Sequence, residues 1–249
     1  MSAEAHLGID LAWSTRARSG VAVVGTSGAL VDSATVRTDD EIIGWLDHGG
    51  WDPVVVALDA PLIVTNATGR RACEALIARA YGRYHAGPYP SNLGNPLFNP
   101  PRGGDLAKRL GGSLDPGHLP TPGSPVCLEV YPHPAMVALF SLGRVLPYKS
   151  RRHRALPVRR SAFEALADHM EALQPLRLTT NTRWAQLRSV IGAATRPVDL
   201  KRAEDEIDAI FCAHLAWLWQ HEPGTLQVYG SLTKGCIVAP PEPSHAPTR

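Results

Sequence analysis

The run of five apolar residues at 54–58 constrains the fold more than any other feature of this sequence. It reads Val-Val-Val-Ala-Leu and lacks the alternation of apolar and polar residues that marks a half-exposed strand. Such a run is typical of a parallel strand that helices cover on both faces of a sheet. Apolar runs at 6–13, 20–25 and 30–36 have short links and predict an antiparallel meander. A capped helix over 38–46 would then be the crossover that makes 54–58 a central parallel strand.

The rest of the chain predicts one more strand of this sheet, a set of helices and a long insertion. Residues 81–125 are crowded with Gly, Pro and Asn, which predicts an irregular insertion that serves as a lid or binding surface, or as a plain surface excursion. The strand is expected at 126–131, the helices at 68–80, 134–142, 161–173, 182–194 and 200–220, and two short strands at 226–229 and 236–239. We therefore expect a single α/β domain over 1–240, with a mixed five-stranded sheet of three antiparallel and two parallel strands, and a Pro-rich, disordered tail at 241–249.

Composition and charge exclude several classes of protein. The 249 residues suffice for a buried core, and the 22 Gly and 22 Pro stay below the level of low-complexity chains. No apolar run approaches the roughly 20 residues that cross a bilayer, and the amino terminus does not resemble a signal peptide, so we expect a cytoplasmic protein without membrane contact.

The four cysteines form no Cys-x-x-Cys pair, which argues against zinc and a disulfide framework. With a formal charge of +2, any basic surface for nucleic acid must be local.

Three carboxylates interrupt or end apolar strands. Asp10, Asp59 and Glu129 each lie in or directly after such a run, where a charge is costly without a partner. Neighbouring strands lie about 4.8 Å apart, so the three side chains could share one small cation. Carboxylate oxygens are the ligands that Mg²⁺ prefers, and the group predicts a metal site. Asp10 and Asp59 could instead cap turns, and Glu129 could pair with a buried arginine.

The predicted helix at 200–220 begins with a second acidic group. Asp205 and Asp208 are three residues apart and share a face, so both could point at one cation. Glu204 and Glu206 are better explained by the helix dipole, which favours acids in the first turn.

These motifs together resemble a known family. Residues 8–13 (Gly-Ile-Asp-Leu-Ala-Trp), 58–62 (Leu-Asp-Ala-Pro-Leu), 129–132 (Glu-Val-Tyr-Pro) and 204–209 (Glu-Asp-Glu-Ile-Asp-Ala) are similar to domain-of-unknown-function family 429, whose members are described as predicted RNase H-like nucleases. The resemblance covers roughly residues 6–240 and ends with a segment, 235–240, that is similar to the family's last strand. It implies an RNase H-like fold with acidic residues gathered at the centre of the sheet.

The resemblance also implies an activity, namely hydrolysis of phosphodiester bonds in DNA or RNA with two Mg²⁺ or Mn²⁺ ions. In such a reaction one ion activates water and the other stabilises the leaving oxygen. The implied metal ligands are Asp10, Asp59, Asp205 and Asp208, and the implied catalytic group is Asp10, Asp59, Glu129 and Asp208.

A basic segment supplies candidate contacts to nucleic acid. The loop expected at 143–160 carries an acid-free stretch of Lys and Arg from 149, suited to a phosphate backbone, although it could simply be a solvated loop. The candidate contacts are Arg70, Arg71, Lys149, Arg151, Arg152 and Arg154. His133 could assist proton transfer or contact phosphate, or it could be structural.

Two other functions share these features. A noncatalytic binding or regulatory module could keep the scaffold without turnover. Actin-like sugar kinases and ATPases also begin with a Gly-Ile-Asp strand, but here Ala12 and Trp13 stand where those proteins have a Gly-rich phosphate turn. No motif in the sequence predicts a protein partner.

Overall fold

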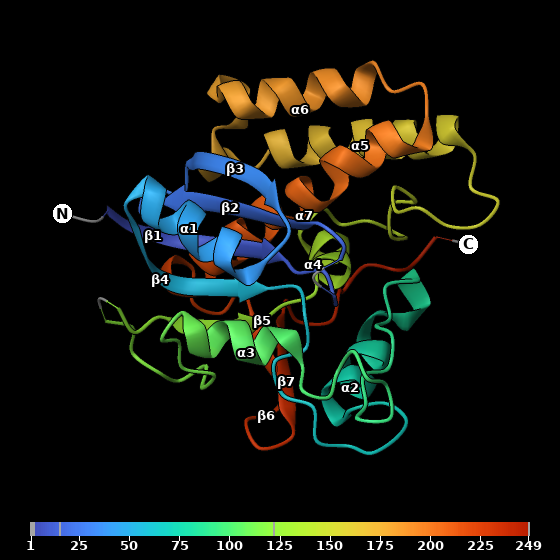
Figure 1. Ribbon diagram of the computed structural model, residues 1–249. Coiled ribbons are helices and arrows are strands. Elements are labelled where there is room, and N and C mark those ends of the chain that lie inside the picture. The colour runs from blue at the N-terminus through green and yellow to red at the C-terminus, as the bar shows by residue number, and fades with distance from the viewer. Residues whose placement is uncertain (1–2, 15, 122, 249) are drawn as a thin grey trace.

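The computed structural model describes residues 3–14, 16–121 and 123–248, and a mixed five-stranded sheet lies at its centre (Figure 1). The strands follow the order β3-β2-β1-β4-β5. Their bounds are β1 (Ala3–Asp10), β2 (Ser19–Gly25), β3 (Leu30–Val36), β4 (Trp51–Leu58) and β5 (Val126–Glu129). The first three strands pair antiparallel, β4 is parallel to β1, and β5 is parallel to β4. This arrangement confirms the predicted sheet.

The two faces of β4 explain its continuous apolar sequence. Val55 and Ala57 belong to the core beneath helix α7 (Pro197–His221), whereas Val56 and Leu58 belong to the core on the opposite face. That opposite face is covered by α1 (Asp39–Gly49) and α3 (Arg102–Arg109). Helices α5 (Leu156–Glu171) and α6 (Thr182–Gly192) pack beyond α7 in the first core (Figure 1). Every side chain of the run is therefore buried, as the sequence predicted.

Two glycines let α7 approach the sheet closely. A Cβ atom at Gly8 of β1 would lie 2.0 Å from the backbone nitrogen of Ala213, and one at Gly20 of β2 would lie 1.8 Å from the carbonyl oxygen of Asp205. Such distances forbid any side chain at either position. Because Gly20 pairs with Asp10 across the sheet, the same approach brings the beginning of α7 against the end of β1.

A smaller unit lies beside β5. Helix α2 (Ala72–Tyr81) packs on the hairpin of β6 (Gln227–Ser231) and β7 (Gly235–Ala239), and α4 (Pro132–Leu139) contributes Val137 to the same core. An isolated bridge between Val130 and Val238 connects the hairpin to the strand that precedes α4. The remaining helical turns are short 3-10 segments at Gly82–Tyr84, Gln174–Leu176 and Leu178–Thr180.

The insertion at 81–125 is not irregular throughout, contrary to expectation, because it contains α3. The sequence did not predict this helix, because two glycines in its first turn weaken the helical pattern. Gly103 and Gly104 lie so close to the chain at 60–62 that Cβ atoms there would come within 2.7 Å and 2.4 Å of the carbonyl oxygens of Pro61 and Leu62. Leu106 is fully buried against the sheet. The glycines therefore serve packing and weaken the local helix signal.

Two other differences from the expected boundaries concern the basic loop and the first strand. The basic loop ends at 155, because α5 begins at Leu156 with a proline in its first turn. The first strand ends at Asp10, so Trp13 belongs to the loop that follows.

The carboxyl-terminal segment is ordered up to Thr248 rather than disordered. The carbonyl oxygens of Pro240 and Pro241 accept hydrogen bonds from the hydroxyl of Tyr81, at 2.7 and 2.8 Å. The carbonyl of His245 accepts one from Tyr84. Buried tyrosine hydroxyls need acceptors, and an extended segment without regular structure offers free carbonyls.

Across the described ranges, no helix combines the length and the apolar composition needed to cross a membrane.

Candidate functional site

Four aspartates from three elements meet where β1 and β4 end. Asp10 is the last residue of β1, and Asp59 directly follows β4, where its N–H donates to the carbonyl of Ile9 at 2.8 Å. Helix α7 supplies Asp205 and Asp208. Asp10, Asp59 and Asp205 line a cavity of about 560 Å³, and Asp208 is fully buried behind them. The structure therefore brings together the four residues that we proposed as metal ligands.

The proximity of these carboxyls changes their acidity. Burial raises the pKa of Asp10 to about 7, and the charges of Asp208 and Asp205 add to the effect while Lys149 opposes it. Burial, followed by the charge of Asp10, raises the pKa of Asp59 well above its usual range. Two or more carboxylates that repel one another in this way favour a bound cation.

Lys149 partly neutralises this cluster from within. Its Nζ lies 3.8 Å from Asp10 Oδ2 and 3.8 Å from Glu204 Oε1, and it also contacts Asp208 Oδ2. The hydroxyl of Tyr148 donates to Asp208 Oδ1 at 2.8 Å. Burial lowers the pKa of Lys149, but the charges of Asp208 and Asp10 outweigh it, so the pKa is well above its usual value. The ammonium group of Lys149 therefore points into the acidic cluster, although the residue also lines the cavity, and its contact with nucleic acid stays a prediction.

The remaining acids at the start of α7 hold the fold together. Glu204 contacts Arg159 at 3.2 Å, and Glu206 accepts hydrogen bonds from the hydroxyl of Ser33 and from Arg183 at 2.6–2.7 Å. Because α7 begins at Pro197, neither acid lies in its first turn, so partners on other elements and not the helix dipole account for both.

Glu129 is held by an arginine and does not face the aspartates as a free ligand. Arg71 donates two hydrogen bonds to its carboxylate, at 2.5 and 2.9 Å, and the N–H of Leu62 donates a third at 2.9 Å. Burial raises the pKa of Glu129, although Arg71 opposes the change. The alternative of a buried ion pair is the one that the structure supports, and the catalytic assignment of Glu129 is corrected accordingly.

The nucleic-acid assignment of Arg71 fails for the same reason. Its exposed fraction is only 3%, and it also donates to Glu74 at 2.8 Å and to the carbonyl of Ile63 at 3.0 Å. Four of its five N–H groups are donated to Glu74, Glu129 and Ile63, so its guanidinium is committed within the fold.

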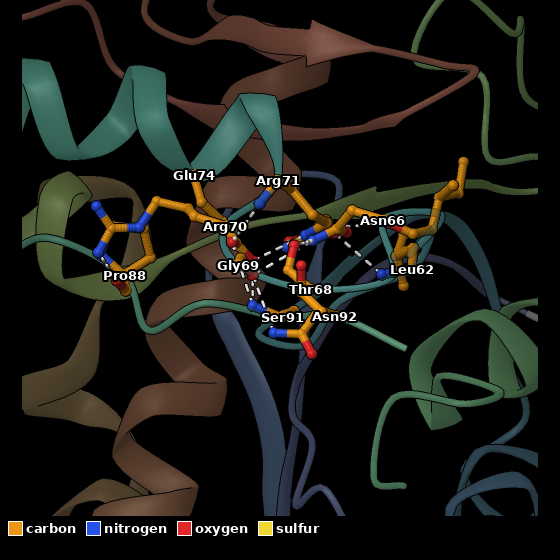
Figure 2. Close-up of polar contacts among 12 residues, drawn as sticks. Leu62, Asn66, Thr68, Gly69, Arg70, Arg71, Glu74, Pro88, Ser91 and Asn92 are labelled. Atoms are coloured by element: carbon orange, nitrogen blue, oxygen red, sulfur yellow. Dashed lines mark hydrogen bonds and ion pairs between the residues drawn. The ribbon is translucent and has the colours of Figure 1, made fainter. Parts of the chain in front are cut away.

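Glu74 and its neighbours also hold the insertion against the segment 62–74, as Figure 2 shows. Glu74 accepts hydrogen bonds from the N–H of Ser91 at 3.1 and 3.2 Å, and the amide of Asn92 donates to the carbonyl of Gly69 at 2.9 Å. Arg70 is exposed and donates to the carbonyl of Pro88 at 3.4 Å. The segments 62–74 and 88–92 therefore form a single wall next to Asp59.

Basic side chains gather at the mouth of the cavity. Arg151 is exposed and lines it, Arg152 is exposed nearby in the chain, and Arg154 donates to the carbonyl of Lys149 at 2.6 Å. Burial lowers the pKa of Arg154, and its neighbours Arg151, Arg159 and Arg144 lower it further. Such a concentration of positive charge attracts an anion.

His133 is neutral at physiological pH. Burial lowers its pKa to about 3, and the charges of Lys149, Arg151 and Arg154 contribute. Its Nδ1 lies 3.3 Å from the hydroxyl of Tyr131, and its buried Nε2 has no hydrogen-bond partner in the described part of the chain. The lowered pKa favours the neutral imidazole near neutral pH and gives no support to His133 as a proton donor, so a role in proton transfer stays a prediction.

Comparison with known proteins places the chain in a family. The family described as "Protein of unknown function (DUF429)" matches residues 8–233, a range that includes the four aspartates. The chain belongs to this family. Neither the curated proteins nor the solved structures include a match. The family resemblance noted in the sequence is thus confirmed, and the family description assigns no activity.

The donor set of this DUF429 chain suits a hard divalent cation. Asp208 Oδ2 is buried and receives no hydrogen bond among the described residues, although the ammonium group of Lys149 lies against it. Among the described residues, however, no group of three or more His, Cys, Asp or Glu side chains is arranged to hold a metal ion. A metal at Asp10 and Asp208 would therefore replace the ammonium group of Lys149.

Sequence reasoning missed several residues that line the cavity of the DUF429 chain. Lys201, which contacts Asp205, was detectable as a partner four residues away on one helix. Trp13, Tyr89 and Tyr131 come from three distant segments, and no local pattern connects them.

Proposed function

We propose that this chain is an RNase H-like nuclease that uses divalent metal ions to hydrolyse phosphodiester bonds of DNA or RNA. The observation that carries the proposal is the convergence of Asp10, Asp59, Asp205 and Asp208 at one cavity. Separate elements deliver these acids, at an energetic cost that a bound cation would offset. The order of the five strands agrees with the RNase H-like arrangement implied by the sequence.

The chain's own groups support this chemistry in two ways. The four aspartates would hold Mg²⁺ or Mn²⁺, and the ions would supply an activated water and charge stabilisation at the phosphate. Around them, Arg18 and Arg151 line the same cavity and would attract and orient the phosphodiester. Glu129 is absent from this assignment because Arg71 already occupies its carboxylate.

The direct test is cleavage of a panel of single-stranded, duplex, hybrid and branched DNA and RNA with Mn²⁺. Asp10→Asn and Asp208→Asn should each abolish the activity of the wild type. Asp199→Asn is the matched control, because Asp199 lies in the first turn of the same helix and pairs only locally with Arg196. Activity that survives both site substitutions would contradict the proposal.

A noncatalytic binding module is the second candidate, and one observation favours it. Lys149 already contacts Asp208 and lies 3.8 Å from Asp10, so the carboxylates have an internal cation without any metal. Thermal unfolding with and without Mn²⁺ separates the two functions. A nuclease site should gain about 2.7 kcal/mol at a hundredfold excess over the dissociation constant, and Asp10→Asn should not. No gain at millimolar Mn²⁺, together with no cleavage, would favour the module.

A further inference from the structure

We propose that the cavity binds an unpaired nucleobase against Trp13 and Tyr89, so that the substrate is single-stranded nucleic acid or an unpaired end. This inference rests on the proposed function and narrows its substrate class. It comes from two aromatic side chains that the fold places at the acidic cavity and leaves open to solvent.

Both rings are unusually accessible for their size. Trp13 has an exposed fraction of 45% and Tyr89 of 67%, and both line the cavity that Asp10 and Asp59 also line. Trp13 lies three residues after the end of β1, whereas Tyr89 comes from the insertion, so residues 76 positions apart in the chain line one cavity. Large exposed aromatics at a charged cavity are typical of surfaces that stack on bases.

Contacts hold the ring of Trp13 and the chain on either side of Tyr89 in place. The indole of Trp13 packs edge to face on Phe98, with ring centroids 5.1 Å apart, and Phe98 is only 2% exposed. The chain on either side of Tyr89 is held by two hydrogen bonds, because the carbonyl of Pro88 accepts from Arg70 and the N–H of Ser91 donates to Glu74 (Figure 2). The ring of Trp13 and the backbone position of Tyr89 are therefore set before any ligand arrives, which reduces the entropy cost of stacking.

The surroundings match a nucleotide in charge and in size. Arg18 and Arg151 line the same cavity as the two rings and provide positive charge for the phosphates on either side of the base. The volume of about 560 Å³ lies within the range of small-ligand sites.

A paired base would have to leave its stack to reach these rings. In a duplex each base is stacked and paired, and its extrusion costs a few kcal/mol. A single strand presents its bases freely, so the cavity selects for unpaired substrate without reading its sequence.

The test compares three oligonucleotides by fluorescence anisotropy. They are an eight-residue thymidine strand, a strand of equal length with abasic sites in place of the bases, and a blunt hairpin duplex. Ca²⁺ replaces Mn²⁺, and a gel verifies that each oligonucleotide stays intact. The abasic strand retains the phosphates and removes only the stacking.

We expect the wild type to bind the thymidine strand about 5- to 150-fold more tightly than the abasic strand, the range for one stacked base. Trp13→Leu and Tyr89→Leu should each reduce this ratio without changing the affinity for the abasic strand. Tyr89→Phe should preserve it, because the ring remains. Unfolding temperatures equal to that of the wild type will show that the variants fold.

Three results would overturn the inference. They are equal wild-type affinities for the thymidine and abasic strands, an unchanged ratio in Trp13→Leu, or tighter binding of the blunt duplex. Cleavage with Mn²⁺ is measured separately and tests the proposed function. Binding that depends on the base, without cleavage, would support the base subsite and contradict the nuclease.

Discussion

Replacement of Arg71 by methionine tests whether the acids near the cavity form one functional group or two separate clusters. Arg71 is 3% exposed and donates to Glu129 at 2.5 and 2.9 Å and to Glu74 at 2.8 Å. Arg71→Met leaves both carboxylates buried without their cation. Breaking a buried ion pair in this way costs about 3–5 kcal/mol. For a chain of this size each kcal/mol lowers the unfolding temperature by about 2–4 °C, so we expect a decrease of about 6–20 °C.

A second substitution, at Glu129, the ion-pair partner of Arg71, tests whether Glu129 has a structural role or binds metal. Glu129→Gln in the Arg71→Met background removes one uncompensated carboxylate, so the double variant should be more stable than Arg71→Met alone. Free energies of unfolding for the wild type, both single variants and the double variant form a cycle, and contacting residues typically give interaction energies of about 0.5–3 kcal/mol. All four proteins should retain the stabilisation by Mn²⁺, because in our assignment Glu129 is not a ligand.

Two outcomes would refute this reasoning. One is a change of less than about 1 kcal/mol in Arg71→Met, which would mean that the pair carries little of the local stability. The other is a Glu129→Gln protein that keeps its unfolding temperature but loses the Mn²⁺ effect as completely as Asp10→Asn does. The second result would restore Glu129 to the metal site.

Two further predictions concern the aspartate cluster. The pKa of Asp10 is about 7 in the folded protein, against 3.8 for an ordinary aspartate. Between these two pH values the folded state therefore keeps a proton on Asp10 that the unfolded state has lost. The metal-free wild type should therefore lose up to about 4 kcal/mol relative to Asp10→Asn as pH rises from 4 to 7.5, measured by urea unfolding. Parallel pH profiles for the two proteins would contradict it. Lys149→Gln should lower the stability of the metal-free protein and tighten Mn²⁺ binding by about tenfold or more, because its ammonium group no longer competes for Asp208, and calorimetric titration measures the change. Weaker Mn²⁺ binding in this variant would show that the lysine supports the site.

The strands could be predicted because their signals are local. Successive side chains of β4 point to opposite faces, and helices cover both, so Val55 and Val56 are buried alike and the run shows no alternation. Asp10 and Asp59 were detectable because a charge at the end of such a run is conspicuous. Asp205 and Asp208 followed from helical spacing. Each of these inferences depended on residues close together in the chain.

The roles of the basic residues could not be predicted, because they depend on partners far away in the sequence. Arg70 and Arg71 are adjacent and chemically identical, yet one is exposed and the other is enclosed by Glu129, 58 positions further along. Lys149 appears within a basic run, but its ammonium group contacts Asp208 on α7. A run of positive charge predicts a basic surface, and only the tertiary structure shows which of its members point inward.

The charge balance of the cluster connects its pH dependence with its affinity for metal. Four aspartates face the ammonium groups of Lys149 and Lys201, so two negative charges stay uncompensated when every aspartate is ionised. Protonation relieves part of this excess, and together with burial, which is the larger cause, this raises the pKa of Asp10 to about 7. A divalent cation would relieve the same excess, and it must displace the proton to do so. One imbalance therefore underlies both properties, and Asp10→Asn should weaken both together. A variant that lost only one of them would show that the proton and the cation occupy different parts of the cluster.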